Sequence, residues 1–243
     1  MRPEEAFVSL IVPVYNEENR LEKAVPHVFE YFRSIFHRWE ILYVDDGSTD
    51  STSQKLLALQ QTYPALQVIR NVRNYGKGRA IRNGFSAAQG DFLLFSDADF
   101  STPVEETSRL LEFIFQGYDI AIGSRALPDS NVEVHQSWMR EALGKAGNLL
   151  VKALLPLQIN DTQCGFKIFR KDAARLILPK LTIDGFAFDI EMLTVAALNG
   201  LRIAEVPVTW RNVPETKVRP IHSLYVLRDL FSIRFHAALH QYR

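Results

Sequence analysis

Short apolar segments alternate with helical patterns through residue 124, and this alternation limits the possible fold more than any other feature. Each apolar segment has the length of a strand, and in the stretch that follows, apolar residues recur every three or four positions, as on one face of a helix. Strands that alternate with helices predict a parallel sheet with helices on both faces. Pro26 is expected to start or kink the first helix. The predicted strands cover residues 8–13, 40–44, 66–70, 91–96 and 118–124.

The alternation becomes less regular beyond Arg125. Residues 127–136 are polar, which predicts a mobile loop. Further helices are predicted at residues 137–155, 172–179 and 188–199, and further strands at 164–169 and 203–208.

The last predicted helix, at residues 221–242, combines an apolar stripe with an excess of basic side chains. Such a basic amphipathic helix is typical of a segment that lies on a membrane surface. Docking against the core or pairing with a second copy of the chain are equally good interpretations. The predicted stripe consists of Leu224, Leu227, Phe231, Phe235 and Ala238.

The charge balance and the cysteine count exclude several classes of protein. Lys+Arg and Asp+Glu both number 28, so no overall field attracts nucleic acid. The single cysteine, Cys164, excludes an internal disulfide and fits a reducing compartment. The N-terminus lacks a signal-peptide pattern, and no segment has the length and apolarity of a spanning helix. We therefore expect a cytoplasmic protein that is either soluble or peripheral on the cytosolic face of a membrane.

Polar and glycine-containing sequences follow the predicted strands, where parallel sheets bind their ligands. After the fourth strand come Asp97 and Asp99, whose side chains point to the same side of an extended backbone. Two carboxylates so placed suit a divalent cation shared with a phosphate-bearing ligand. The other strand-end sequences are Tyr15–Glu17, Asp45–Asp46, Asn74–Gly76 and Ser124–Arg125.

These motifs, in this order, resemble the family 2 glycosyltransferases. The resemblance is carried by residues 11–17, 44–50, 74–78, 97–99 and 123–125. The later segments 161–167 and 185–191 are similar to the branch of the family that glycosylates polyprenyl phosphates. Within that branch the motifs are most like those of dolichyl-phosphate β-glucosyltransferases, followed by dolichol-phosphate mannose synthases.

The resemblance implies a GT-A fold, which is Rossmann-like, with a mostly parallel sheet, helices on both faces and a C-terminal amphipathic helix. The catalytic domain would span residues 1–220, with a nucleotide-sugar half at 1–125 and an acceptor half at 126–220. The amphipathic helix would follow at 221–243.

The resemblance also implies a nucleotide-sugar donor. Asp97 and Asp99 would hold Mg²⁺ or Mn²⁺ on the donor diphosphate. Asp46 would accept a hydrogen bond from the uracil N–H with support from Asp45, although Asp-Gly-Ser is also an ordinary turn sequence. The remaining residues predicted to bind the donor are Pro13, Tyr15, Glu17, Gly76, Lys77, Gly78 and Ala98.

For the acceptor, the resemblance implies that Arg125 and Arg140 hold a phosphate, which suits the guanidinium fork. A solvated helix face is an equally good interpretation of Arg140. Gln163 and Lys167 are further candidates for acceptor binding. The predicted catalytic set is Asp97, Asp99, Arg125, Asp161 and Asp189.

The expected reaction is an inverting, metal-dependent transfer of a hexose, expected to be glucose, from a UDP-sugar to a polyprenyl phosphate. One alternative is a GDP-mannose donor. Another is a sugar or alcohol acceptor, which would require a base such as Asp189 or Glu191, whereas a phosphate monoester with a second pKa of about 6 needs none. A binding protein that kept the fold without turnover is the non-enzyme alternative. The expected partners are the donor, the lipid acceptor, a membrane surface and a second copy of the chain.

Overall fold

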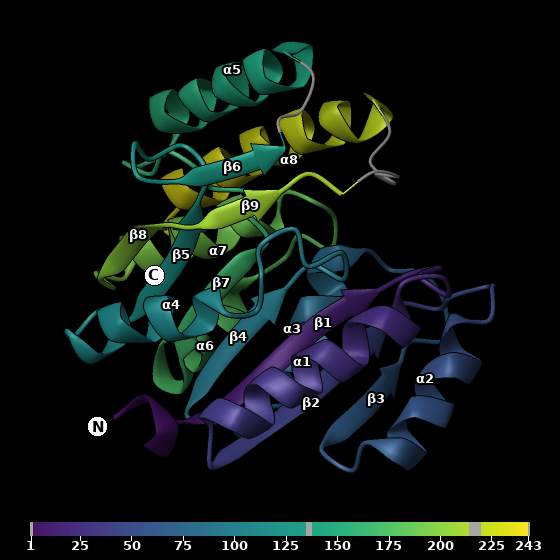
Figure 1. Ribbon diagram of the computed structural model, residues 1–243. Coiled ribbons are helices and arrows are strands. Elements are labelled where there is room, and N and C mark those ends of the chain that lie inside the picture. The colour runs from purple at the N-terminus through teal and green to yellow at the C-terminus, as the bar shows by residue number, and fades with distance from the viewer. Residues whose placement is uncertain (1, 135–137, 214–219, 243) are drawn as a thin grey trace.

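A seven-stranded sheet runs through the centre of the molecule (Figure 1). The structure is a computed structural model that describes residues 2–134, 138–213 and 220–242. The strand order is β3-β2-β1-β4-β7-β5-β8, and each described pairing is parallel except those of β7 with β4 and β5. The predicted mostly parallel sheet is therefore confirmed. The strands are β1 (Phe7–Val14), β2 (Arg38–Asp45), β3 (Leu66–Arg70), β4 (Phe92–Ser96), β5 (Ile120–Ser124), β7 (Phe166–Arg170) and β8 (Ile203–Pro207).

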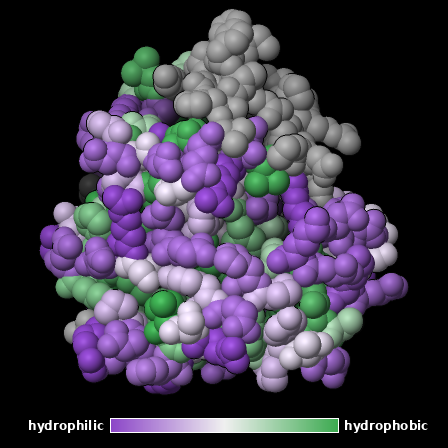
Figure 2. Space-filling view, viewed as in Figure 1, coloured by the Kyte–Doolittle hydropathy of each residue, from purple (hydrophilic) through white to green (hydrophobic). Residues whose placement is uncertain are grey.

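Helices cover both faces of this sheet, as the alternating pattern predicts. Successive side chains of a strand point to opposite faces. In β1, Leu10 and Val12 pack under one helical layer, and Ile11 packs under the other. The first layer contains α1 (Leu21–Ile35), α2 (Thr52–Thr62) and α4 (Glu106–Phe115), and the second contains α3 (Lys77–Ala87), α5 (Trp138–Leu154), α6 (Lys171–Ile177), α7 (Phe188–Leu198) and α8 (Pro220–Ala238). The surface over α1 and α4 is mostly hydrophilic, as expected of amphipathic helices (Figure 2).

One local prediction was wrong, and one of the two alternatives given for Pro26 is excluded. Asn131–Val134, predicted to lie in a mobile loop, forms strand β6, which pairs with β9 (Thr209–Arg211). The partner strand lies far away in the sequence, so the polar composition of residues 127–136 gave no sign of the pairing. Of the two alternatives for Pro26, the helix start is excluded, because α1 begins at Leu21 and includes Pro26 in its second turn, and the kink stays a prediction.

The C-terminal helix α8 packs differently from its predicted stripe. Leu230 and Ile233 belong to the buried core and face α7. By contrast, Leu227, Phe231 and Phe235 are exposed by 41%, 56% and 62%. Helix α8 thus has one apolar side toward the core and a second toward solvent, so the predicted single stripe is not confirmed.

A buried carboxylate fastens the end of the chain to α7. Glu191 is fully buried, and it accepts hydrogen bonds from the backbone N–H groups of Thr182 and Ile183 at 2.9 to 3.1 Å. The Tyr242 hydroxyl donates a further bond to the same carboxylate at 2.8 Å. The free-energy cost of burying this charge is offset, because the neighbouring N–H and hydroxyl groups donate hydrogen bonds to the carboxylate.

Replacing the Glu191 carboxylate should therefore weaken the fold. Glu191→Gln turns an N–H₂ group toward donors, and we expect the free energy of unfolding to fall by about 1–3 kcal/mol. Urea denaturation measures this loss. Glu112→Gln, at an exposed position of α4, should change stability by less than about 0.5 kcal/mol. Equal unfolding free energies for the two variants would contradict the role given to Glu191.

Candidate active site

The reversed direction of β7 brings the second half of the chain to the predicted ligand-binding edge. The parallel strands β4 and β5 end at this edge, and β7, which is antiparallel to both, begins there. The residues just before β7 therefore meet the residues just after β4, and the Asp97 N–H donates to the Gly165 carbonyl at 2.9 Å. The segments 97–99, 123–125 and 161–167, which were predicted separately, form one site.

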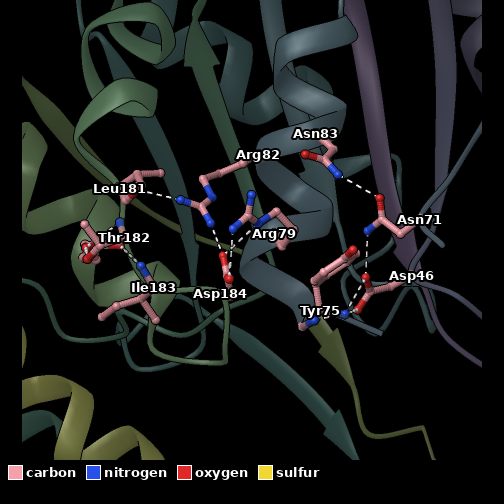
Figure 3. A network of polar contacts seen from close by, with 12 residues as sticks. Asp46, Asn71, Tyr75, Arg79, Arg82, Asn83, Leu181, Thr182, Ile183 and Asp184 are labelled. Atoms are coloured by element: carbon pink, nitrogen blue, oxygen red, sulfur yellow. Dashed lines mark hydrogen bonds and ion pairs between the residues drawn. The ribbon is translucent and has the colours of Figure 1, made fainter. Parts of the chain in front are cut away.

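Asp46 organises the loop between β3 and α3. Its carboxylate accepts hydrogen bonds from Asn71 Nδ2 at 2.7 Å and from the backbone N–H groups of Tyr75 and Gly76 at 3.1 and 2.7 Å. Figure 3 shows Asn71 between Asp46 and Asn83 on α3. Gly76 has φ 111°, and a Cβ there would overlap the Asp184 carbonyl, so the loop requires glycine.

The ends of β1 and β2 are tied to each other. The N–H of Asn16 donates to Ser48 Oγ at 2.9 Å, and Asn16 Oδ1 accepts from the N–H of Thr49 at 2.8 Å. Asp45 is fully buried, and its Oδ1 accepts from the Ser48 N–H at 2.9 Å. These contacts form a rigid frame at the edge where the donor pocket is predicted.

The predicted donor residues of β1 lie at the same edge. Pro13 pairs with β2, but the pairing of β4 with β1 ends at Ile11, and a proline is tolerated where no ladder hydrogen bond is needed. The Tyr15 side chain is 36% exposed, and Glu17 forms an ion pair with Arg20 at 2.9 Å.

Asp97 and Asp99 lie close enough to interact electrostatically, and a basic side chain contacts Asp97. Lys77 Nζ lies 2.5 Å from Asp97 Oδ1. Asp99 Oδ1 accepts from the Ser101 N–H at 2.9 Å, and burial, together with the charge of Asp97, raises the pKa of Asp99. A cation beside both carboxylates would relieve the repulsion that the Asp97 charge exerts on ionised Asp99.

The carboxylate pair fits a divalent cation shared with a diphosphate. Within the described residues, no group of three or more His, Cys, Asp or Glu side chains could hold a metal alone. Mg²⁺ and related hard cations are commonly held by one or two carboxylates, with phosphate oxygens and water completing the shell. Asp97 and Asp99 would thus supply the protein ligands, and a bound donor would supply the rest.

Arg125 and Asp161 form a close pair beside the aspartates. Arg125 Nε and Nη2 donate to the two oxygens of Asp161 at 2.7 and 2.8 Å, and the guanidinium stacks over the Trp210 ring. Burial alone would raise the pKa of Asp161, but the hydrogen bonds and charge of Arg125 bring it below its usual value. Both side chains therefore stay ionised in a fixed geometry.

Lys167 and Asp189 form a second, deeper pair. Lys167 is fully buried, and its amine donates to Asp189 Oδ1 at 2.6 Å and to the Cys164 carbonyl at 2.5 Å. Burial raises the pKa of Asp189. Glu191 points away from this pair, toward Thr182 and Tyr242.

The remaining predicted residues have varied surroundings. Gly78 is buried, and its N–H donates to the Asp184 carbonyl at 2.7 Å. Ala98 is half-buried and Gln163 is exposed. The side chain of Arg140 lies outside the described residues. Burial raises the pKa of Cys164 to about 11, which fits a packing residue and an unreactive thiol.

Sequence reasoning missed three residues that shape the site. Asn71 follows β3 directly and could have been found by the strand-end rule that identified Asp97. Gly165 lies within the recognised segment 161–167, but only the three-dimensional structure places it against the Asp97 carboxylate. Trp210 lies on β9, which no sequence pattern indicated.

Comparisons with known proteins place these features in a family. The family model described as "Glycosyl transferase family 2" matches residues 9–178. The dolichyl-phosphate beta-glucosyltransferase of Saccharomyces cerevisiae is 34% identical, over 99% of this chain and 78% of that protein. The Homo sapiens protein of the same name is 35% identical, over 93% of this chain and 74% of that protein.

Solved structures share the fold at lower identity. Mannosyl-3-phosphoglycerate synthase from Rubrobacter xylanophilus superposes with a TM-score of 0.73 at 18% identity, over 97% of this chain and 75% of that one. Glucosyl-3-phosphoglycerate synthase from Mycobacterium tuberculosis, in complex with Mn²⁺ and UDP-glucose, gives a TM-score of 0.70 at 20% identity, over 94% of this chain and 79% of that one. The GT-A fold expected from the sequence is confirmed.

The contact between Gly165 and Asp97 yields a direct test of the site. A Cβ on Gly165 would overlap the Asp97 carboxylate, which must then move by about an ångström. We expect Gly165→Ala to lower the rate of the catalysed reaction by about 100-fold, since such misplacements are costly, with little loss of thermal stability. In the control, Gly144→Ala, a new Cβ meets nothing within 4 Å and should leave the rate unchanged. An unimpaired Gly165→Ala protein would show that the position of Asp97 does not matter.

Proposed function

We propose that this chain, which belongs to glycosyltransferase family 2, transfers glucose from UDP-glucose to a polyprenyl phosphate of the dolichyl type. Its relatives named dolichyl-phosphate beta-glucosyltransferase align with nearly its whole length. The observation that carries the proposal is that Asp97 interacts electrostatically both with Asp99 and with Arg125 of the Arg125–Asp161 pair, at one sheet edge. A donor diphosphate and an acceptor phosphate each find suitable groups there.

The donor would lie across the ends of β1, β2 and β4. Asp46 holds the loop at Gly76 that would close over the nucleotide, and its predicted contact with the uracil N–H would use the one lone pair that its three donors leave. Asp97 and Asp99 would hold the divalent cation. A bound cation neutralises the negative charge that develops on the leaving diphosphate.

The acceptor would lie near Arg125. Asp161 engages two of the five N–H donors of the guanidinium and fixes its plane. The other N–H groups would orient an acceptor phosphate for attack on C1 of the sugar from the face opposite UDP, which inverts the configuration. With Arg140 and Gln163 as further predicted acceptor ligands, binding and orientation supply most of the catalysis.

The surroundings of the two candidate bases, Asp189 and Glu191, favour a phosphate acceptor over an alcohol acceptor. An alcohol must lose a proton to a carboxylate within hydrogen-bond reach. Asp189 is 3% exposed and already paired with Lys167, and Glu191 is buried among hydrogen-bond donors. A phosphate monoester is largely ionised at neutral pH and needs no such base.

A lipid acceptor requires contact with a bilayer, and we propose that the solvent-facing side of α8 provides it. Phe231 and Phe235 on this side, and Leu239 directly after the helix, are more than half exposed, and Arg228 and Arg234 are exposed nearby. Apolar side chains flanked by arginines are typical of helices that insert into the headgroup region of anionic membranes. None of the helices in the described ranges could itself cross a membrane.

The proposed reaction can be tested with purified protein, dolichyl phosphate in detergent and a panel of nucleotide sugars. We expect glucosyl transfer from UDP-glucose with Mg²⁺ or Mn²⁺, lost on addition of a chelator. Asp97→Ala should lower the rate at least about 1,000-fold, because a cation ligand is removed. Asp91→Ala, at the opposite end of β4, serves as the matched control and should remain active.

Other outcomes identify the alternatives. Preferred transfer from GDP-mannose would replace the glucose assignment. Metal-dependent UDP binding without turnover on any lipid phosphate would indicate a binding protein. Transfer to a sugar or another alcohol that depends on Asp189 or Glu191 would contradict the phosphate acceptor.

The membrane proposal predicts a specific loss of vesicle binding. Replacing Phe231 and Phe235 together by Ser should weaken binding to vesicles that contain anionic lipid by at least about tenfold, since each buried Phe contributes about 1.5–3 kcal/mol. Flotation measures this change. Leu57→Ser removes an apolar side chain of similar exposure from α2 and should have no effect. If the double variant floats with vesicles as before but no longer forms a dimer in gel filtration, this side of α8 instead binds a second copy of the chain.

A further inference from the structure

Lys77 places its ammonium group among side chains that attract a cation. It is the first residue of α3, its side chain is 20% exposed, and its Nζ lies 2.5 Å from Asp97 Oδ1. The rings of Phe95 and Phe188 lie 5.9 and 5.5 Å from the same nitrogen. An ammonium group that contacts a carboxylate and two aromatic rings is held by both charge and cation–π attraction.

The surrounding carboxylates keep this amine charged. Burial acts to lower the pKa of Lys77, but Asp97 and Asp189 together raise it above its ordinary value. Asp99 acts in the same direction. The positive charge of Lys77 therefore offsets the negative charge of the aspartate pair.

The backbone that carries Lys77 is fixed, so only its side chain can leave the site. The N–H groups of Gly78 and Arg79 donate to the Asp184 carbonyl at 2.7 and 3.3 Å, and Arg79 forms an ion pair with the Asp184 carboxylate (Figure 3). The lysine stem, in contrast, has four methylene groups and several rotamers. The ammonium can therefore move by rotation of the side chain without any shift of α3.

We propose that Lys77 is a built-in counter-ion that occupies the cation position at Asp97 and competes with the divalent metal for it. An ammonium and a divalent cation on the same carboxylate oxygen repel each other strongly in a partly buried site. The metal alone must displace Lys77, whereas a metal that arrives with a diphosphate offers the ammonium a new anionic partner. The inference rests on the proposed nucleotide-sugar site, and it adds an order of binding in which the donor brings the metal.

The competition can be measured without any turnover. In Lys77→Met the apolar stem remains and the charge is lost. We expect the nucleotide-free variant to bind Mn²⁺ at least about tenfold more tightly than the unmodified chain, because the ion pair between Lys77 and Asp97 no longer has to be broken. Titration followed by the electron paramagnetic resonance of free Mn²⁺ gives both affinities. Unchanged, weaker or undetectable Mn²⁺ binding by Lys77→Met overturns the proposal.

Matched variants separate competition from a general change of charge. Arg79→Met removes a positive charge from the same helical turn, but that charge pairs with Asp184, so Mn²⁺ affinity should stay unchanged. Adding Asp97→Asn to Lys77→Met should abolish the gain in affinity. Thermal unfolding of each variant checks that the fold is retained. If Arg79→Met gained as much Mn²⁺ affinity as Lys77→Met, the gain would follow from the change in net charge alone, and the proposal would be overturned.

A second titration separates this inference from the proposed function. UDP should raise the Mn²⁺ affinity of the unmodified chain by a larger factor than it raises that of Lys77→Met. Only the unmodified chain has an ammonium group that competes with the metal, and the diphosphate of UDP would draw this group away. Failure of the unmodified chain to bind UDP at all would refute the nucleotide-sugar site, whereas the nucleotide-free comparison would still decide whether Lys77 competes. Equal enhancement of both proteins by UDP would count against the proposed order of binding.

Discussion

Neutralisation of buried charge is the constraint on which the site depends. Ionised groups lose their hydration at the end of a sheet, so each needs a partner of opposite sign or several hydrogen bonds. The structure meets this need by pairing Arg125 with Asp161 and Lys167 with Asp189. Both pairs are set in fixed positions before any ligand binds. The polar groups of the site are thereby preorganised, and preorganisation reduces the cost of orienting charged substrates.

The strand ends were the most predictable part of the molecule. Apolar strands and the polar residues after them follow from local pattern, and the rule that ligands bind at the carboxyl ends of parallel strands brought Asp97, Asp99 and Arg125 together. The reversal of β7 could not be read in the same way, because a short apolar segment has the same pattern in either direction. The pairing of Lys167 with Asp189 depends on that reversal and was therefore not foreseen.

Helix α8 shows a different limit of sequence reasoning. Apolar residues occur on more than one side of this helix, so helical periodicity alone could not decide which of them faces the core. The predicted stripe included Phe231 and Phe235, whereas the core contains Leu230 and Ile233. Only packing against α7 decides between the two sides, and packing is a property of the whole fold.

The position of β7 also has a kinetic consequence. β4 and β5 are not neighbours in the sheet, because β7 lies between them and is made more than 40 residues after β5. During synthesis the edges of β4 and β5 that pair with β7 stay open until residue 170 has left the ribosome, and such edges are prone to wrong pairing. Folding of the sheet must therefore wait for a contact that is distant in sequence, which slows the final step. Truncation before β7 would leave β4 and β5 without the strand that joins them, and such an incomplete sheet is prone to aggregation.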